Sequence, residues 1–138
     1  MENNYLIELT KQQQLSTVFK TNEYTSRFGL SLSKEEAEIL VTDYANSLKE
    51  HRRFEFGGSI IEKIIFAFCD SPYIYQDNYV DSIGRLVDLF YLFKNEFHDE
   101  LSDDELLQFM RDEFDETCQG DFDYFEEAIC IHQKNYFQ

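Results

Sequence analysis

Proline and glycine are scarce in this chain, which has one proline and five glycines in 138 residues. Folds made of strands and tight turns need more of both, so the composition argues against all-β architectures and favours helices. Apolar runs are also short, far below the roughly 20 residues that cross a bilayer, and we expect no membrane-spanning segment. Basic residues number 12 against 28 acidic ones. Because phosphate binding requires Lys and Arg, this balance excludes a typical nucleic-acid-binding protein.

Cysteine is also sparse. Cys69, Cys118 and Cys130 lie far apart and form no C-x-x-C pair. With no apolar leader at the N-terminus, this pattern indicates a reducing, cytoplasmic environment. Cys69 and Cys130 have apolar neighbours and are expected in the core, whereas Cys118, beside Gly120, can be exposed. No thiol has a cationic neighbour that would activate it, and nothing in the chain indicates a cofactor.

Hydrophobic residues make up 43% of the chain and aromatic residues 17%. This is enough material for one buried core, so we expect a single domain over residues 1–138. Residues 1–20 are polar and are expected to be irregular and loosely ordered. Leu6, Ile7 and Leu9 within them fit a short docked helix or an edge strand, and the sequence does not decide between the two.

Helix-end signals and apolar spacing predict an all-α bundle of five to six helices. Ser33 with Glu36 and Ser102 with Glu105 have the spacing of capping boxes, in which a hydroxyl and a carboxylate satisfy the first free amides of a helix. The stretch Leu86–Phe93 is apolar nearly all round, which is typical of a central helix. A short helix is predicted at Asn22–Phe28, closed by Gly29, and a turn or extended link at Phe54–Gly58. The longer predicted helices run from Lys34 to about His51, from Ile60 to Cys69 before Pro72, from about Asn78 to His98, from Asp103 to before Gly120 and from about Asp123 onward.

Acidic residues are concentrated near the C-terminus. Thirteen of the 28 lie between Asp99 and Glu127, where Arg111 is the one basic residue, so this segment carries −12 of the total −16. Four carboxylates crowd the end of a predicted helix, where each costs on the order of 0.3–1 kcal/mol against the helix dipole. We therefore predict a non-enzymatic adaptor or protein-binding domain whose acidic face meets a basic protein surface through Asp112, Glu113, Asp115 and Glu116. Solubility alone, or imitation of a phosphate backbone, would also use such charge.

A divalent cation is an alternative ligand for the same acid. The residues from 115 to 126 resemble a degenerate EF-hand loop, with Gly120 at the sharp turn. Thr117 and Gln119 fit this pattern poorly, and a helix closed at Gly120 followed by a newly capped helix explains the residues equally well. The carboxylates that would bind calcium are Asp115, Asp121, Asp123 and Glu126.

A small enzyme is the remaining alternative. The most site-like polar group is Lys94–His98, at the end of the central helix, although cations there also oppose the negative end of the helix dipole. Lys49, Arg52 and Arg53 around His51 fit a solvated helix end for the same reason. The histidines are far apart in the sequence, and nothing in the pattern brings them together.

Several short motifs occur in a fixed order along the chain. They are Phe56-Gly57-Gly58, Ala67-Phe68-Cys69-Asp70-Ser71-Pro72-Tyr73, Phe93-Lys94-Asn95-Glu96, Leu101-Ser102-Asp103-Asp104-Glu105-Leu106 and Cys118-Gln119-Gly120. With these motifs, residues 22–120 resemble a bacterial family of small acidic proteins known as a domain of unknown function. The resemblance implies a bacterial cytoplasmic protein and transfers no catalytic residue, cofactor or partner.

Overall fold

The structure, a computed structural model, is an all-α bundle, as the sequence predicts. It describes the backbone of residues 2–55 and 60–136 and the side chains of residues 11–55 and 60–131. Residues 56–58 of the predicted turn lie outside this part. The elements are α1 (Glu2–Lys20), α2 (Asn22–Thr25), η1 (Ser26–Phe28), α3 (Lys34–Glu50), α4 (Ile60–Phe68), η2 (Gln76–Asn78), α5 (Tyr79–Glu96), α6 (Asp103–Asp112), η3 (Glu113–Thr117) and α7 (Phe122–Tyr136).

The helix ends form where the sequence predicts them. The Ser33 hydroxyl accepts from the Glu36 amide at 3.1 Å, and the Glu36 carboxylate accepts from the Ser33 amide at 2.9 Å. The same reciprocal pair is present at Ser102 and Glu105. Gly29 has φ +76°, a left-handed conformation that closes the short helix before it. The expectation of an irregular N-terminal segment is wrong, because α1 is a continuous helix from Glu2 to Lys20, and the choice between a short helix and an edge strand is thereby answered by a helix.

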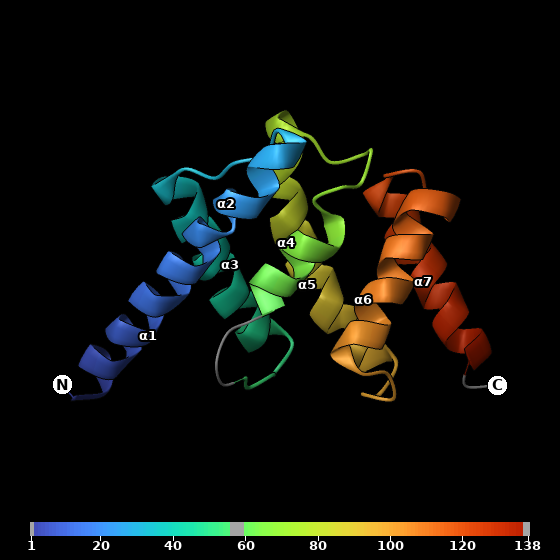
Figure 1. Cartoon of the computed structure of the whole chain (residues 1–138). Coiled ribbons are helices and arrows are strands. Elements are labelled where there is room, and N and C mark those ends of the chain that lie inside the picture. Colours follow the sequence, from blue (N-terminus) through green and yellow to red (C-terminus); the bar gives the residue numbers. More distant parts are fainter. Residues whose placement is uncertain (1, 56–59, 137–138) are drawn as a thin grey trace.

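Helix α5 is the centre of the bundle. It packs against α3, α4, α6 and α7, while α1 and α7 lie toward opposite sides of the molecule (Figure 1). The predicted central stretch supplies much of the core, since Leu86, Val87, Phe90 and Phe93 have no exposed surface. Burying side chains of this size contributes about 1.5–3 kcal/mol each, which explains why an acidic chain folds compactly.

The chain reverses between α6 and α7 through a tight aromatic corner. Helix α6 widens into the π-helical turn η3, which places the ring of Phe114 in the core. Phe114 meets Phe68, Phe122 and Phe125 with ring centroids 5.1–5.6 Å apart. Gly120 then takes φ +81° against Tyr73, so close that a Cβ on Gly120 would lie 2.6 Å from that of Tyr73. Only glycine fits this position without displacing its neighbour.

Two of the three cysteines are fully enclosed. Cys69 is buried, as predicted, and Cys118 is buried as well, so the expectation that Cys118 can be exposed is wrong. Burial raises the pKa of the Cys118 thiol to about 11, with Glu113 and Asp121 adding to the effect. Cys130 is half-buried. The two buried thiols therefore act as core residues without nucleophilic activation.

In the described part of the chain, none of the helices combines the length and the apolar character that a membrane crossing would need.

Candidate functional site: an acidic groove beside an aromatic ledge

The four carboxylates predicted to bind a partner differ in their environments. Asp112 and Glu116 are exposed, whereas Glu113 and Asp115 are half-buried. Asp115 accepts a hydrogen bond from the Arg111 guanidinium at 2.6 Å and another from the Ser71 hydroxyl at 2.7 Å. Asp115 therefore forms internal contacts with Ser71 and Arg111, while Asp112 and Glu116 remain accessible to another molecule.

Arg111 links α6 to the end of α4. Besides Asp115, its guanidinium donates to the Ala67 carbonyl at 2.5 Å and to the Asp70 carboxylate at 2.6 Å. Burial alone would lower the pKa of Arg111, but the hydrogen bonds to Asp115 and Asp70 raise it. The unfavourable interaction of the carboxylates with the C-terminal end of α6 is therefore partly offset by Arg111, which lies next to them in the sequence.

A groove of about 610 Å³ opens beside this arginine, between α4 and α6. We call it the acidic groove. Phe66, Ala67 and Leu107 form its apolar part, and Lys63 reaches across to Asp104 at 3.4 Å. Its remaining lining is polar or charged and comprises Asp70, Gln108, Arg111, Asp112, Asp115 and Glu116.

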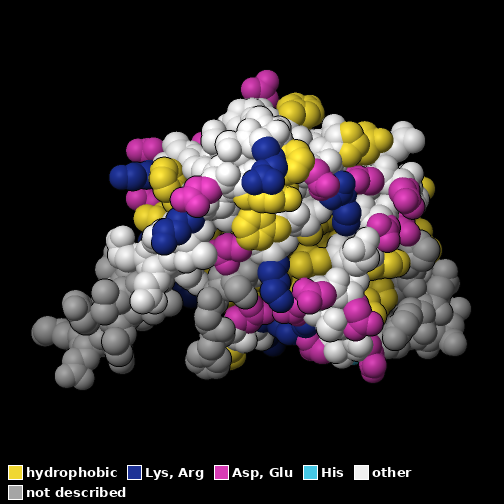
Figure 2. Space-filling view, viewed as in Figure 1, with side chains coloured by type: hydrophobic (Ala, Val, Ile, Leu, Met, Phe, Trp, Pro, Cys, Tyr) yellow, Lys and Arg dark blue, Asp and Glu magenta, His cyan; other side chains and the backbone are white. Residues whose placement is uncertain are grey.

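The apolar part of the groove continues onto an exposed group of rings, Tyr24, Phe28 and Phe66, which we call the aromatic ledge. Their side chains remain 40–49% exposed. The Tyr24 ring lies edge-on to Phe66 at 5.5 Å and next to Phe28 at 5.7 Å. The Arg27 guanidinium lies over the Tyr24 ring, 4.2 Å from its centroid. Figure 2 shows hydrophobic side chains gathered on this face with charged side chains around them. The ledge cannot be recognised in the sequence, because its rings come from separate helices.

The carboxylates of the proposed calcium loop each have a protein partner. Asp115 pairs with Arg111, and Asp121 caps α7 by accepting from the Tyr124 amide at 3.1 Å. Asp123 and Glu126 both face Arg85, at 3.2 and 3.6 Å. Calcium binding here stays a prediction, to which these contacts add no support.

The end of α3 is more structured than the sequence suggests. The side chain of Arg53 donates to both carboxylate oxygens of Asp99, at 2.7 and 3.0 Å, and to the Asn95 amide oxygen at 2.9 Å. These hydrogen bonds lower the pKa of Asp99 and raise that of Arg53. His51 pairs with Asp88, so interpreting His51 and Arg53 as a solvated helix end is wrong.

The residues of the predicted enzyme site, Lys94–His98, contact different parts of the protein and do not form one site. Lys94 pairs with Asp103, Asn95 donates to the His51 carbonyl, and His98 is exposed with φ +53°. Only His51, Asp88 and neighbouring Glu50 bring three potential metal ligands together in the described residues. The one sequence signal for this group is that Asp88 is the only charged residue in Leu86–Phe93.

The fold and the groove together define a small all-α protein with an acidic, partly apolar surface site. The chain belongs to the family described as "Family of unknown function (DUF6323)", whose model matches residues 17–136. This confirms the resemblance to a family of unknown function. Neither the curated proteins nor the solved structures contain a match to this chain.

Proposed function

We propose that this protein is a non-enzymatic binding domain that holds a basic, amphipathic segment of a partner protein in the acidic groove and on the aromatic ledge. The observation that carries the proposal is the continuity of the two surfaces. Phe66 belongs to both, so one segment lying along α4 would contact the exposed rings and the carboxylates together.

The aromatic ledge supplies the apolar contact. Aromatic side chains are enriched at the centres of protein interfaces, where a few rings contribute most of the binding energy. Phe66 is 49% exposed and Tyr24 40%, whereas core rings such as Phe68 and Phe114 have no exposed surface. A helix with Leu, Ile or Phe on one face would cover both rings and the apolar part of the groove.

The acidic groove supplies the charge preference. Its cations already have acidic partners inside the protein, because Arg111 pairs with Asp70 and Asp115 and Lys63 lies near Asp104. The exposed carboxylates of Asp112 and Glu116 remain for a partner, and Lys or Arg side chains complement them. Such charges mainly accelerate association and select the partner, and salt weakens their effect.

The proposal can be tested by selecting binders from a library of displayed random peptides, with the Phe66→Ala variant as a counter-selection. The selected peptides should combine Lys or Arg with apolar residues at helical spacing. Synthetic copies of them should bind Phe66→Ala about five- to thirtyfold more weakly than the wild type, the equivalent of about 1–2 kcal/mol for a half-exposed aromatic anchor. Ile39→Ala is the matched control, because Ile39 is 50% exposed on α3 and lies outside the groove.

The charge preference needs its own variant. Asp112→Asn with Glu116→Gln should weaken the peptides most at low salt, whereas Glu38→Gln with Asp77→Asn removes the same charge from exposed positions elsewhere and should leave binding unchanged. Asp115 is kept intact because it pairs with Arg111. A selection that yields no peptides, or peptides that are acidic or bind Phe66→Ala as well as the wild type, would refute the proposal.

We further propose that the protein works in the bacterial cytoplasm without an organic cofactor and without binding nucleic acid. The resemblance to a bacterial family and the two buried, unactivated thiols support this setting.

A further inference from the structure

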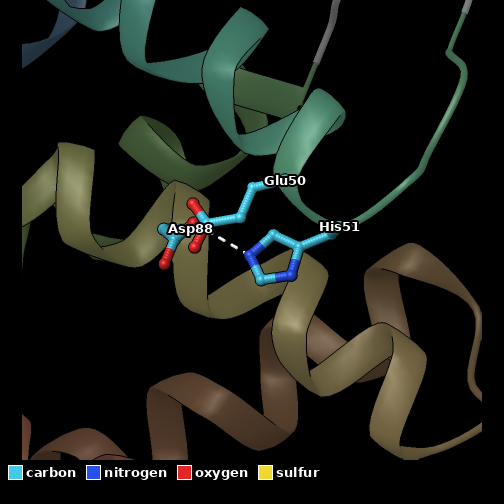
Figure 3. A group of neighbouring side chains, drawn as sticks. All are labelled: Glu50, His51 and Asp88. Carbon is cyan, nitrogen blue, oxygen red and sulfur yellow. Dashed lines mark hydrogen bonds and ion pairs between the residues drawn. The ribbon is translucent and has the colours of Figure 1, made fainter.

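Glu50, His51 and Asp88 meet where the end of α3 packs on the middle of α5. One ligand atom from each residue, the two carboxylate oxygens and the imidazole nitrogen, lies within 4.8 Å of the others. Figure 3 shows the Glu50 and Asp88 carboxylates and the His51 ring directed toward one another. This group lies on other helices than the acidic groove and is independent of the proposed partner site.

The spacing of two of these atoms is close to that of neighbouring ligands in a metal site. His51 Nε2 and Asp88 Oδ1 are 2.9 Å apart. Two ligands at about 2.1 Å from a tetrahedral ion, the usual distance for imidazole nitrogen and carboxylate oxygen, are about 3.4 Å apart. The two side chains therefore need to separate by only about 0.5 Å to admit an ion, which side-chain rotation provides without moving either helix. Glu50 is exposed at the helix end, so its long side chain can bring its carboxylate into contact with the same ion.

The surrounding contacts fix both inner ligands in place. The Ser47 hydroxyl donates to Asp88 Oδ1 at 3.0 Å and orients that carboxylate. The backbone of His51 is held by the Asn95 side chain, which donates to its carbonyl at 3.1 Å, and Arg53 in turn holds Asn95. Groups that orient the ligands in this way typically change metal affinity by about 10- to 100-fold.

Charge also favours a cation at this point. Two carboxylates approach each other here, beside the imidazole of His51. The His51 side chain is only 12% exposed, while that of Asp88 is 41% exposed, so the group is mostly buried on one side and open to water on the other. An ion bound here would keep water in its remaining positions.

We propose that Glu50, His51 and Asp88 bind a divalent first-row transition-metal ion of the zinc class. The imidazole nitrogen selects this class, because calcium and magnesium prefer sites made only of oxygen. Three protein ligands with positions left for water are typical of exchangeable or reactive metal centres, whereas structural zinc sites are closed by four.

The test is a zinc titration of the full-length, chelator-treated protein, with calorimetry for affinity and stoichiometry. About 150 mM salt and an excess of magnesium suppress diffuse binding to the acidic surface. We expect one high-affinity zinc per chain and a melting temperature that rises with zinc concentration. Cobalt substitution should give visible absorption bands that report nitrogen and oxygen ligation.

Variants separate a site from general attraction to acid. Glu50→Gln changes an exposed side chain and should weaken zinc binding at least about tenfold, and Asp88→Asn should weaken it more, with folding checked by circular dichroism. His98→Asn, at an exposed histidine with φ +53°, is the matched control and should bind zinc like the wild type. Equal affinity in the wild type and Glu50→Gln, or several weak equivalents per chain, would show that His51 and Asp88 form only an internal ion pair and would overturn the proposal.

Discussion

Replacing Arg111 by Gln should destabilise the protein by about 2–3 kcal/mol. Arg111 donates to Asp115, Asp70 and the Ala67 carbonyl, so the substitution removes two ion pairs and the link between α4 and α6. Breaking a fully buried ion pair costs about 3–5 kcal/mol. The side chains of Arg111 and Asp115 are 21% and 20% exposed, and that of Asp70 is 55% exposed, so water recovers part of this cost. The Ser71 hydroxyl, which still donates to Asp115, recovers a little more.

Urea unfolding monitored by circular dichroism measures this change in free energy. Arg85→Gln is the matched control, because Arg85 also faces two carboxylates, Asp123 and Glu126, but at the surface. Exposed pairs of this kind contribute about 0–1 kcal/mol, and added salt screens them. If Arg111→Gln and Arg85→Gln differed by less than about 0.5 kcal/mol, the role of Arg111 as the link between the helices would be refuted.

Two further substitutions test the core and the corner before α7. Glu62 is 9% exposed, its Oε1 has no hydrogen-bond partner in the described part of the chain, and burial raises its pKa. Because the folded protein disfavours the charged form, Glu62→Gln should stabilise by about 1–2 kcal/mol at neutral pH. In urea titrations this gain should shrink as the pH falls below the raised pKa of Glu62 in the folded protein and be absent below the ordinary Glu pKa; a gain independent of pH would contradict the assignment. Gly120→Ala should lower the free energy of unfolding by more than about 2 kcal/mol in the same assay, because of its φ of +81° and the clash with Tyr73. Gly29→Ala is the control, since Gly29 also has a positive φ but has open space around it, and it should cost only about 1–2 kcal/mol. Equal losses would show that the clash is unimportant.

The helices could be predicted from the sequence because their signals are local. The capping boxes at Ser33 and Ser102 and the glycine at position 29 act within one helical turn, and the structure forms each of them as expected. The apolar stretch Leu86–Phe93 likewise required only the rule that a helix without a polar face lies in the core. Residues 1–20 carry neither a cap nor a clear apolar stripe, which is why their helix was not predicted.

The site could be predicted only in part, because its contacts join residues far apart in the chain. The acidic residues near the end of α6 were identified, but Arg111 reaches Asp70 across 41 positions, and the rings of the aromatic ledge come from separate helices. His51 and Asp88 are 37 positions apart, and although Asp88 stands out as the one charge in an apolar stretch, no local pattern connects it with His51. Cys118 was misjudged for the same reason, since its burial depends on how the π-helical turn folds back on the core.

The fold changes the meaning of the acidic segment. In the sequence it is a block of like charge, but the described structure surrounds it with basic residues from earlier helices and loops. Asp99 pairs with Arg53, Asp103 with Lys94 and Asp104 with Lys63. Asp123 of α7 pairs with Arg85. Much of the acid therefore lies in ion pairs between the acidic segment and the rest of the bundle, most of them at the surface. The exposed carboxylates of Asp112 and Glu116 lie instead at the acidic groove, next to exposed rings. A role in solubility would require no such placement, whereas a binding site for a basic, amphipathic segment requires apolar surface and uncompensated acid side by side.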